Sequence, residues 1–309
     1  MKRSLRAKLF FKFVDHSMKK KYVGNEQEYI TKRCPGQTFE IGNHRETKYK
    51  PSKGYRLLKG QVAYVNYELL IPAKNEAEET SKRRVVYMLH GGAYHLSMSD
   101  MYNGVMEKYS HGSLDVFAID YRTAPKDPYP AALRDAEIGY SILLSMGYEP
   151  YNIIFAGDSA GGGLALALAL KLNADKRPLP DKFVLSSPWV DLSEQYTPEQ
   201  KANDVLFGWG NVLEMCATAY ANGHDLKDPY ISPLYGDFTC LKGKRVYISA
   251  AKGEMLEKSA AELAEKMKAA GVNVAYDNLD TGMHAIITMY MLGLPETKYA
   301  WEHVKQFAQ

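Results

Sequence analysis

The amino-acid sequence predicts an α/β fold in which a mostly parallel central sheet is flanked by helices. From residue 61 onward, short apolar runs rich in β-branched and aromatic residues alternate with segments whose apolar residues recur at helical spacing. No Pro-, Gly- or Ser-rich linker and no internal repeat divides the 309 residues. The chain is therefore expected to form one large domain with insertions rather than two domains.

The predicted strands follow one another along most of the chain. Residues 62–71 alternate between apolar and polar side chains, which is typical of an early antiparallel strand. The later runs are almost continuously apolar, as central parallel strands are when both of their faces are buried. These runs are residues 85–89, 116–121, 152–157, 183–187, 245–251 and 273–279.

Helices are predicted between these strands, over residues 131–146, 162–175 and 257–271, and again near residues 296–308. At the N-terminus, apolar residues at roughly helical spacing predict an amphipathic helix with a lysine-rich outer face. These residues are Leu5, Leu9, Phe10, Phe13 and Val14. Such a helix packs on the body of the protein, forms a mobile flap or makes a weak contact with a membrane surface, and the sequence leaves these roles open.

Two stretches interrupt the alternation of strands and helices. Ligands of open α/β sheets bind beyond the carboxyl ends of the strands, so both stretches are expected to form a helical cap over a site at that edge. The predicted organisation is an N-terminal cap segment (1–50), a first part of the core (51–190), a cap insertion (191–225) and a second part of the core (226–309).

The composition excludes several classes of function. A formal net charge of +3 and the lack of a nucleic-acid-binding motif argue against a nucleic-acid partner. Cys34, Cys216 and Cys240 form no CxxC pair, which argues against a disulfide framework or a cysteine-built metal site and favours a reducing cytoplasm. The N-terminal apolar stretch is too short and interrupted for a signal peptide or a spanning helix. The sequence implies no metal and no organic cofactor, and it does not determine an oligomeric state.

The stretch "NIIFAGDSAGGGLALALAL", residues 152–170, places one serine on a predicted strand-to-helix turn. Its "GDSAG" fits the nucleophile motif G-x-S-x-G in the context that this motif requires. Gly157 and Gly161 leave room for a sharp turn that lifts the Ser159 hydroxyl clear of the backbone. The N–H of Ala160, at the positive end of the following helix, can donate to a developing oxyanion. The alternative is an ordinary turn without a catalytic role.

A second glycine-rich stretch, "HGGAY" at residues 90–94, directly follows the predicted strand 85–89. Gly91 and Gly92 can bring bare backbone N–H groups close to a substrate carbonyl oxygen, so they are expected to act as oxyanion donors together with Ala160. His90 is expected to fix this loop by hydrogen bonding rather than to act as a base. A plain glycine turn is the alternative.

A serine nucleophile needs a base that accepts its proton. His284 is the best placed of the eight histidines, because it follows the last predicted strand in a loop that returns toward Ser159. Glu254 follows the strand 245–251 at the head of a helix and is the predicted acid that orients His284. Asp280, four residues before His284, is the competing acid, and Asp191 is a more distant one.

With these motifs, the sequence resembles the hormone-sensitive-lipase-like branch of the α/β-hydrolases, the bacterial carboxylesterases with an HGGG-type oxyanion loop. The resemblance runs from about residue 83 to 290 and includes "DYRTAPKDPYPAAL" (120–133), "SPWVDLS" (187–193) and "DPYISPLYGD" (228–237). It implies the α/β-hydrolase fold with a cap built from an N-terminal segment and an insertion after the sixth strand. Glu254 stands where the family usually has aspartate, and Ala93 replaces the third glycine.

Together, the motifs and the resemblance predict a serine carboxylic-ester hydrolase that works through an acyl-enzyme. The expected substrates are small, largely uncharged esters with short acyl groups, acetyl esters among them. The candidate pocket residues are Tyr94, Phe207, Trp209 and Tyr220, and simple packing within the cap is the alternative role for each. Two other functions stay open: a ligand-binding protein of the same fold without hydrolysis, and a thioesterase or amidase with the same triad.

Overall fold

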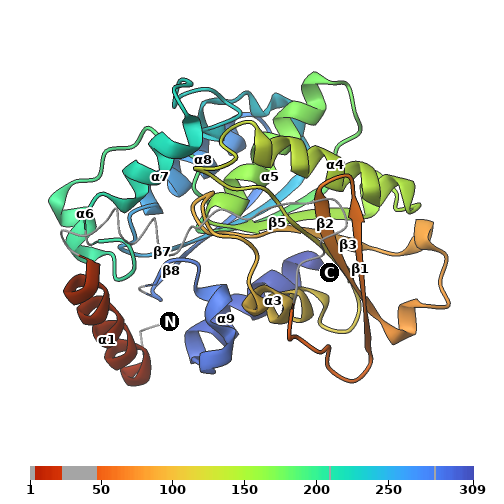
Figure 1. The fold of residues 1–309 in the computed structure, drawn as a ribbon, viewed down its shortest axis with the longest axis horizontal. Coiled ribbons are helices and arrows are strands. Elements are labelled where there is room, and N and C mark those ends of the chain that lie inside the picture. Colours follow the sequence, from red (N-terminus) through yellow and green to blue (C-terminus); the bar gives the residue numbers. More distant parts are fainter. Residues whose placement is uncertain (1–3, 23–46, 209, 282) are drawn as a thin grey trace.

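One mixed sheet forms the centre of the molecule (Figure 1). The computed structural model describes residues 4–22, 47–208, 210–281 and 283–309. Within these ranges, eight strands pair in the order β1-β2-β4-β3-β5-β6-β7-β8. β2 pairs antiparallel with both β1 and β4, and all other neighbours are parallel, so the predicted mostly parallel sheet is confirmed. The strands are β1 (Tyr55–Val62), β2 (Val65–Pro72), β3 (Val85–Leu89), β4 (Asp115–Asp120), β5 (Ile153–Asp158), β6 (Lys182–Ser186), β7 (Arg245–Ala251) and β8 (Asn273–Leu279).

Helices cover both faces of this sheet. In Figure 1, α4, α5 and α8 lie on one side of the sheet, and α3 and α9 lie on the other. The helices in the described ranges are α1 (Leu5–Tyr22), α3 (Asp100–Ser110), α4 (Ala131–Ser145), α5 (Ala160–Ala174), α6 (Pro198–Asn203), α7 (Val212–Ala221), α8 (Glu257–Ala269) and α9 (Pro295–Ala308). Most strands are buried on both faces, which explains why their sequences are almost continuously apolar.

Successive side chains of the central strands point into two separate apolar clusters. Tyr87, Phe117 and Phe155 pack edge to face on one face, with ring centroids 5.5 Å apart in each contact. Their neighbours Met88 and Ala156 belong to the cluster on the opposite face. Each large apolar side chain that is fully buried contributes about 1.5–3 kcal/mol, so this aromatic row is a major source of stability.

The structure contains two elements that the sequence analysis missed. Residues 62–71 were expected to form a single early strand, but β1 and β2 form a hairpin whose turn includes Ala63, with a φ of +53°. No residue of β1 is buried, and polar residues interrupt its sequence, so it lacks a long apolar run. Helix α3 contains Gly104, a poor helix former. A Cβ at Gly104 would lie 1.7 Å from the Tyr290 hydroxyl oxygen, so close packing explains the glycine.

The predicted N-terminal helix forms as α1, but the face that packs on the protein is not the one that carries Leu5, Leu9 and Phe13. Ala7 and Phe11 are buried against the body of the protein. Leu5, Leu9 and Phe13, which belong to the predicted apolar stripe, instead face solvent. The helix therefore packs on the protein with one face and presents apolar side chains with another.

The parallel strands bring four motifs of the sequence to one edge of the sheet. "HGGAY" follows β3, and the serine motif follows β5, with Leu89 directly opposite Gly157 in the register. Glu254 follows β7, and His284 follows β8. The carboxyl ends of parallel strands lie at the same edge, so the topology itself gathers these groups.

Candidate active site

Ser159 lies on a sharp turn between β5 and α5. Its φ of +53° and ψ of −124° are unusual for a residue with a side chain, and helix α5 begins at the next residue. A Cβ at Gly157 would lie 2.4 Å from Gly161 C, and one at Gly161 would lie 2.0 Å from Leu89 O. Both glycines are therefore needed for close backbone approach, which is the physical reason for the motif. The N–H of Ser159 donates to Ser186 O at 3.0 Å, which ties the turn to β6.

Glu254 and His284 form a buried pair. Glu254 Oε2 lies 2.6 Å from His284 Nδ1, and Glu254 Oε1 accepts the N–H of Ala251 at 2.7 Å. The N–H of Ala285, next to the histidine, donates to Ser187 Oγ at 3.0 Å and fixes the loop. His284 Nε2 is buried and makes no hydrogen bond with any described residue. The ring is thus held through one nitrogen, and the other is unpaired.

The charges around His284 favour its protonated form. Burial by itself lowers the pKa of His284, but the contact with Glu254 and the nearby carboxylates of Asp204 and Asp158 outweigh it. The pKa of His284 is therefore raised above its usual value. Asp280, the competing acid, lines a separate surface pocket with Asp277 and Tyr299.

The first glycine amide of "HGGAY" is already bound within the protein. The N–H of Gly91 donates to the Tyr102 hydroxyl at 2.8 Å and to Asp158 Oδ1 at 3.2 Å. Tyr102 in turn donates its hydroxyl to Asp158 Oδ2 at 2.9 Å. The N–H groups of Gly92 and Ala93 make no hydrogen bond with the described residues. This arrangement departs from the expectation that Gly91 is an oxyanion donor, because its N–H points into a buried polar network.

Asp158 is a carboxylic acid with an unusual environment. Complete burial raises the pKa of Asp158 to about 6, even though Tyr102, His284 and the Gly91 N–H each favour its charged form. Asp158 immediately precedes the serine, so the same residue contacts the glycine loop and lies next to the nucleophile candidate.

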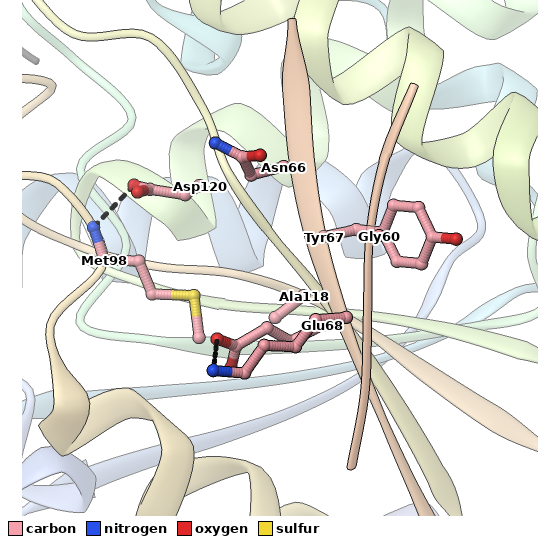
Figure 2. Close-up of a pocket in the computed structure, with 8 residues that line it drawn as sticks. Gly60, Asn66, Tyr67, Glu68, Met98, Ala118 and Asp120 are labelled. Atoms are coloured by element: carbon pink, nitrogen blue, oxygen red, sulfur yellow. Dashed lines mark hydrogen bonds and ion pairs between the residues drawn. The ribbon is translucent and has the colours of Figure 1, made fainter. Parts of the chain in front are cut away.

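The glycine loop is supported from its other side by β4. His90 stacks on Tyr121 with ring centroids 4.1 Å apart, and its Nε2 lies 3.7 Å from Asp120 Oδ1. Asp120 also accepts the N–H of Met98 at 2.8 Å, and Figure 2 shows this bond within a small pocket beside β2 and β4. The pocket is lined by Lys59, Gly60, Asn66, Tyr67, Glu68, Met98, Ala118 and Asp120. His90 Nδ1 also lies 2.7 Å from Gly91 O, so the expected hydrogen bond between His90 and the loop is present.

Three of the four candidate pocket aromatics lie within the described ranges. Tyr94 and Tyr220 are both buried and stack face to face, with ring centroids 3.8 Å apart. Phe207 packs edge to face on His284 at 5.1 Å. Trp209 lies outside the described residues. The structure thus brings Tyr94 next to Tyr220, and Phe207 next to the predicted base.

Sequence reasoning missed Tyr102 and Ser187 as residues of this region. Tyr102 lies on α3, a helix that was not predicted, and only its contact with Asp158 reveals it. Ser187 stands in "SPWVDLS", so the resemblance contained a signal for it. Within the described ranges, no group of three or more His, Cys, Asp or Glu side chains is arranged to hold a metal ion.

Comparison with known proteins places this architecture among ester-cleaving enzymes. A family model described as alpha/beta hydrolase fold matches residues 85–288. An acetyl-hydrolase of Streptomyces hygroscopicus is 32% identical over 244 residues, which cover 78% of this chain and 78% of that protein. An esterase of Acinetobacter venetianus is 31% identical over 234 residues, 74% and 76% of the two chains. A crystal structure of EstE5 soaked with p-nitrophenyl butyrate has a TM-score of 0.80 at 25% identity and covers 99% of this chain and 98% of its own.

Proposed function

Because this chain is an esterase of the α/β-hydrolase family, in its hormone-sensitive-lipase-like branch, we propose that Ser159 is its nucleophile, His284 its base and Glu254 the acid. The 2.6 Å contact between Glu254 Oε2 and His284 Nδ1 is the main support for this assignment. It leaves Nε2 as the nitrogen that can accept a proton, and that nitrogen is buried without another partner.

The proposed reaction has two halves. Ser159 Oγ attacks the ester carbonyl carbon while its proton moves to His284 Nε2, and the carbonyl oxygen becomes an oxyanion. The oxyanion collapses, the bond to the alcohol oxygen breaks, and His284 gives its proton to the leaving alcohol. A water molecule then attacks the acyl-enzyme while His284 accepts its proton, and the acid is released as Ser159 regains a proton.

The proposed oxyanion donors are the N–H groups of Gly92, Ala93 and Ala160. Gly92 and Ala93 take the place of the pair Gly91 and Gly92, because the Gly91 N–H is bound to Tyr102 and Asp158. Ala160 is the first residue of α5, and first-turn amides of a helix have no partner within the helix. Removing one such donor typically lowers turnover by about 10²- to 10³-fold.

The proposed substrates are small, largely uncharged esters with short acyl groups. Tyr94, Tyr220 and Phe207 are bulky, and we assign them, with Trp209, to the walls of the substrate pocket. The Streptomyces hygroscopicus protein is named an acetyl-hydrolase, which supports acetyl esters as a substrate class. EstE5 was soaked with a butyrate ester, which agrees with a short acyl chain.

We assign residues 1–50 and 191–225 to a cap, and residues 51–190 and 226–309 to the core. Ala7 and Phe11 of α1 share an apolar cluster with Val205 and Leu206 of the insertion, which supports a joint role for the two segments. We also propose a cytoplasmic location, which the free thiols of Cys216 and Cys240 support; Cys34 lies outside the described residues.

The solvent face of α1 is proposed to make a weak contact with anionic lipid surfaces. Leu5, Leu9 and Phe13 are 73%, 63% and 68% exposed. The exposed cations Arg6, Lys8, Lys12 and Lys20 lie on the same helix, a pattern typical of interfacial helices. No helix in the described ranges is both long and apolar enough to cross a bilayer.

Sedimentation with vesicles tests the lipid contact. Phosphatidylglycerol-containing vesicles should pellet the protein at low salt, and pure phosphatidylcholine vesicles should not. Leu9→Glu should reduce pelleting, whereas Tyr151→Glu, which changes a side chain that is also 63% exposed, should not. Equal pelleting of both variants, or of both vesicle types, contradicts the proposal.

A panel of p-nitrophenyl esters from acetate to palmitate tests the main proposal, with Ser159→Ala as the control. Acetate and butyrate should be the best substrates, and the variant should lose hydrolysis of all of them. A thioester and an anilide of the preferred acyl group distinguish an esterase from a thioesterase or amidase. Full activity of Ser159→Ala would refute the assigned nucleophile.

A further inference from the structure

A buried aspartate of the insertion lies beside the proposed acid and base. Asp204 follows α6, and its side chain reaches the turn between β7 and α8. We propose that Asp204 is a positioning residue that holds Glu254 and Phe207 in place around His284, so that the insertion and the acid–base pair form one unit. This inference rests on the roles proposed above for Glu254 and His284.

One oxygen of Asp204 holds the turn that carries Glu254. Asp204 Oδ2 accepts the N–H of Met255 at 2.9 Å. On the other side of the turn, Glu254 Oε1 accepts the N–H of Ala251 at 2.7 Å, so Oε2 is left for His284. The Asp204 carboxylate therefore fixes the backbone after Glu254, and the Glu254 carboxylate fixes the backbone before it. Loss of either bond frees part of the turn.

The second oxygen of Asp204 holds the segment that carries Phe207. Asp204 Oδ1 accepts the N–H groups of Leu206 and Phe207, each at 2.8 Å. The Phe207 ring then packs edge to face on His284 at 5.1 Å. Asp204 thus bonds the backbone of Phe207 and the backbone next to Glu254, the two residues that contact the imidazole.

Local turn chemistry explains only half of this arrangement. Aspartate commonly accepts backbone N–H groups two or three residues ahead, and such turns are stable at the surface. Asp204 is instead 3% exposed and uses Oδ2 for an amide 51 residues away. Burial of a carboxylate carries a desolvation cost, which an exposed turn avoids. The long-range bond to Met255 is the observation that a local turn leaves unexplained.

The charge of Asp204 also acts on His284. The carboxylates that act on this imidazole come from three places: Glu254 from the turn after β7, Asp204 from the insertion and Asp158 from the end of β5. All three favour the imidazolium, the form in which the base holds the proton of the serine. Loss of the Asp204 charge should therefore lower the pKa of His284 and weaken this stabilisation.

Asp204→Asn is the decisive variant, because it keeps the shape and removes the charge. Its single carbonyl oxygen can serve the amides of Leu206 and Phe207 or the amide of Met255, but not both sets. We expect kcat to fall by about tenfold or more while KM changes little, since misplaced catalytic groups affect the transition state most. The acidic limb of the pH profile of kcat/KM should move to lower pH. The matched control is Asp225→Asn, which alters an exposed turn where Oδ1 accepts the Lys227 N–H, and it should change neither quantity.

Two further variants separate the possible outcomes. Phe207→Leu removes the ring contact but keeps the Asp204–Met255 bond, so its pH limb should stay close to that of the wild type. If Asp204→Asn keeps the kcat and the pH limb of the wild type, the inference is wrong. A lower Tm without a change in kcat or in the pH limb would show that Asp204 has a purely structural role and would also overturn the inference. If Ser159→Ala is fully active, the proposed function fails instead, whatever Asp204→Asn does.

Discussion

The backbone N–H of Gly91 donates to Asp158 Oδ1 at 3.2 Å, so the residue before the serine holds the glycine loop that follows another strand. Two motifs that are 67 residues apart in the chain are joined by this bond and by the Tyr102 hydroxyl. The geometry of the proposed oxyanion site therefore depends on a buried polar group as well as on glycines.

Removal of the Tyr102 hydroxyl should disturb this loop. Tyr102→Phe takes away both the acceptor for Gly91 N–H and the donor to Asp158 Oδ2, so we expect kcat to fall by about tenfold or more with a smaller change in KM. Tyr109→Phe is the control, because Tyr109 is buried on the same helix and its hydroxyl has no partner among the described residues. Equal kinetics of the two variants contradicts the prediction.

Because of Asp158, the free energy of unfolding should fall as pH rises. Its native pKa is about 6 and its unfolded pKa about 4, so between these values the native state binds the proton that the unfolded state releases. The contribution of Asp158 to the free energy of unfolding is therefore fully present below pH ~4 and is lost as pH rises through about 6. A pKa difference of about two units corresponds to ~3 kcal/mol. Denaturant unfolding of wild type and Asp158→Asn at pH 4 to 7 measures this, and a constant difference between them would count against it.

The raised pKa of His284 should set the acidic limit of activity. A protonated imidazole cannot accept the serine proton, so kcat/KM should decline below a pKa that lies above the usual value of about 6.5. Glu254→Gln should move this limb to lower pH and reduce kcat. Glu254→Ala and Asp280→Ala should be compared, because these residues are the two candidate acids. If kcat collapses in Asp280→Ala but not in Glu254→Ala, the assignment of Glu254 as the acid is wrong.

Gly161→Ala should be severely disruptive. The new Cβ would lie 2.0 Å from Leu89 O and 2.5 Å from His90 O, and these backbone atoms belong to β3 and the glycine loop. We expect a large loss of Tm or of soluble protein. Gly243→Ala is the control, since its Cβ meets nothing within 4 Å and only its φ of +79° opposes alanine. That control should lower the free energy of unfolding by only about 1–2 kcal/mol.

Asp135→Ala should destabilise the fold strongly. Asp135 on α4 is 1% exposed, and Arg122 donates to it through Nε, Nη2 and the backbone N–H. Loss of the carboxylate leaves the guanidinium partly buried without its main partner, which typically costs about 3–5 kcal/mol. Glu265→Ala, which breaks an exposed pair with Lys268, should change the free energy of unfolding by less than about 1 kcal/mol. Similar unfolding midpoints for the two variants contradict this prediction.

Local patterns in the sequence predict the central strands, because a strand buried on both faces must be apolar along its length. The same patterns miss β1, which is half-exposed and rich in polar residues, and α3, whose Gly104 fits only because Tyr290 packs against it. Both elements are specified by tertiary contacts rather than by periodicity. Similarly, the outward-facing stripe of α1 depends on which side of the helix packs on the body, and spacing alone does not determine that side.

For the site, chain order and motif context propose Ser159, His284 and Glu254 as candidates, with Asp280 and Asp191 as competing acids, and the structure pairs His284 with Glu254. Chain order does not reveal Tyr102, whose hydroxyl meets Asp158 across 56 residues, or Asp204, which meets Met255 across 51. The sequence also does not show that the Gly91 amide is occupied, since a glycine pair looks the same whichever N–H faces the substrate. These features depend on side-chain direction, which only the folded chain defines.

The backbone of Ser159 has a thermodynamic consequence for the whole molecule. A φ of +53° with ψ of −124° costs a residue with a Cβ about 1–3 kcal/mol, and glycine adopts such angles far more readily. A glycine at this position would therefore adopt the same backbone angles at a lower cost in folding free energy. The proposed nucleophile therefore lies on a strained turn, and favourable contacts elsewhere in the fold must offset the free energy that this turn costs.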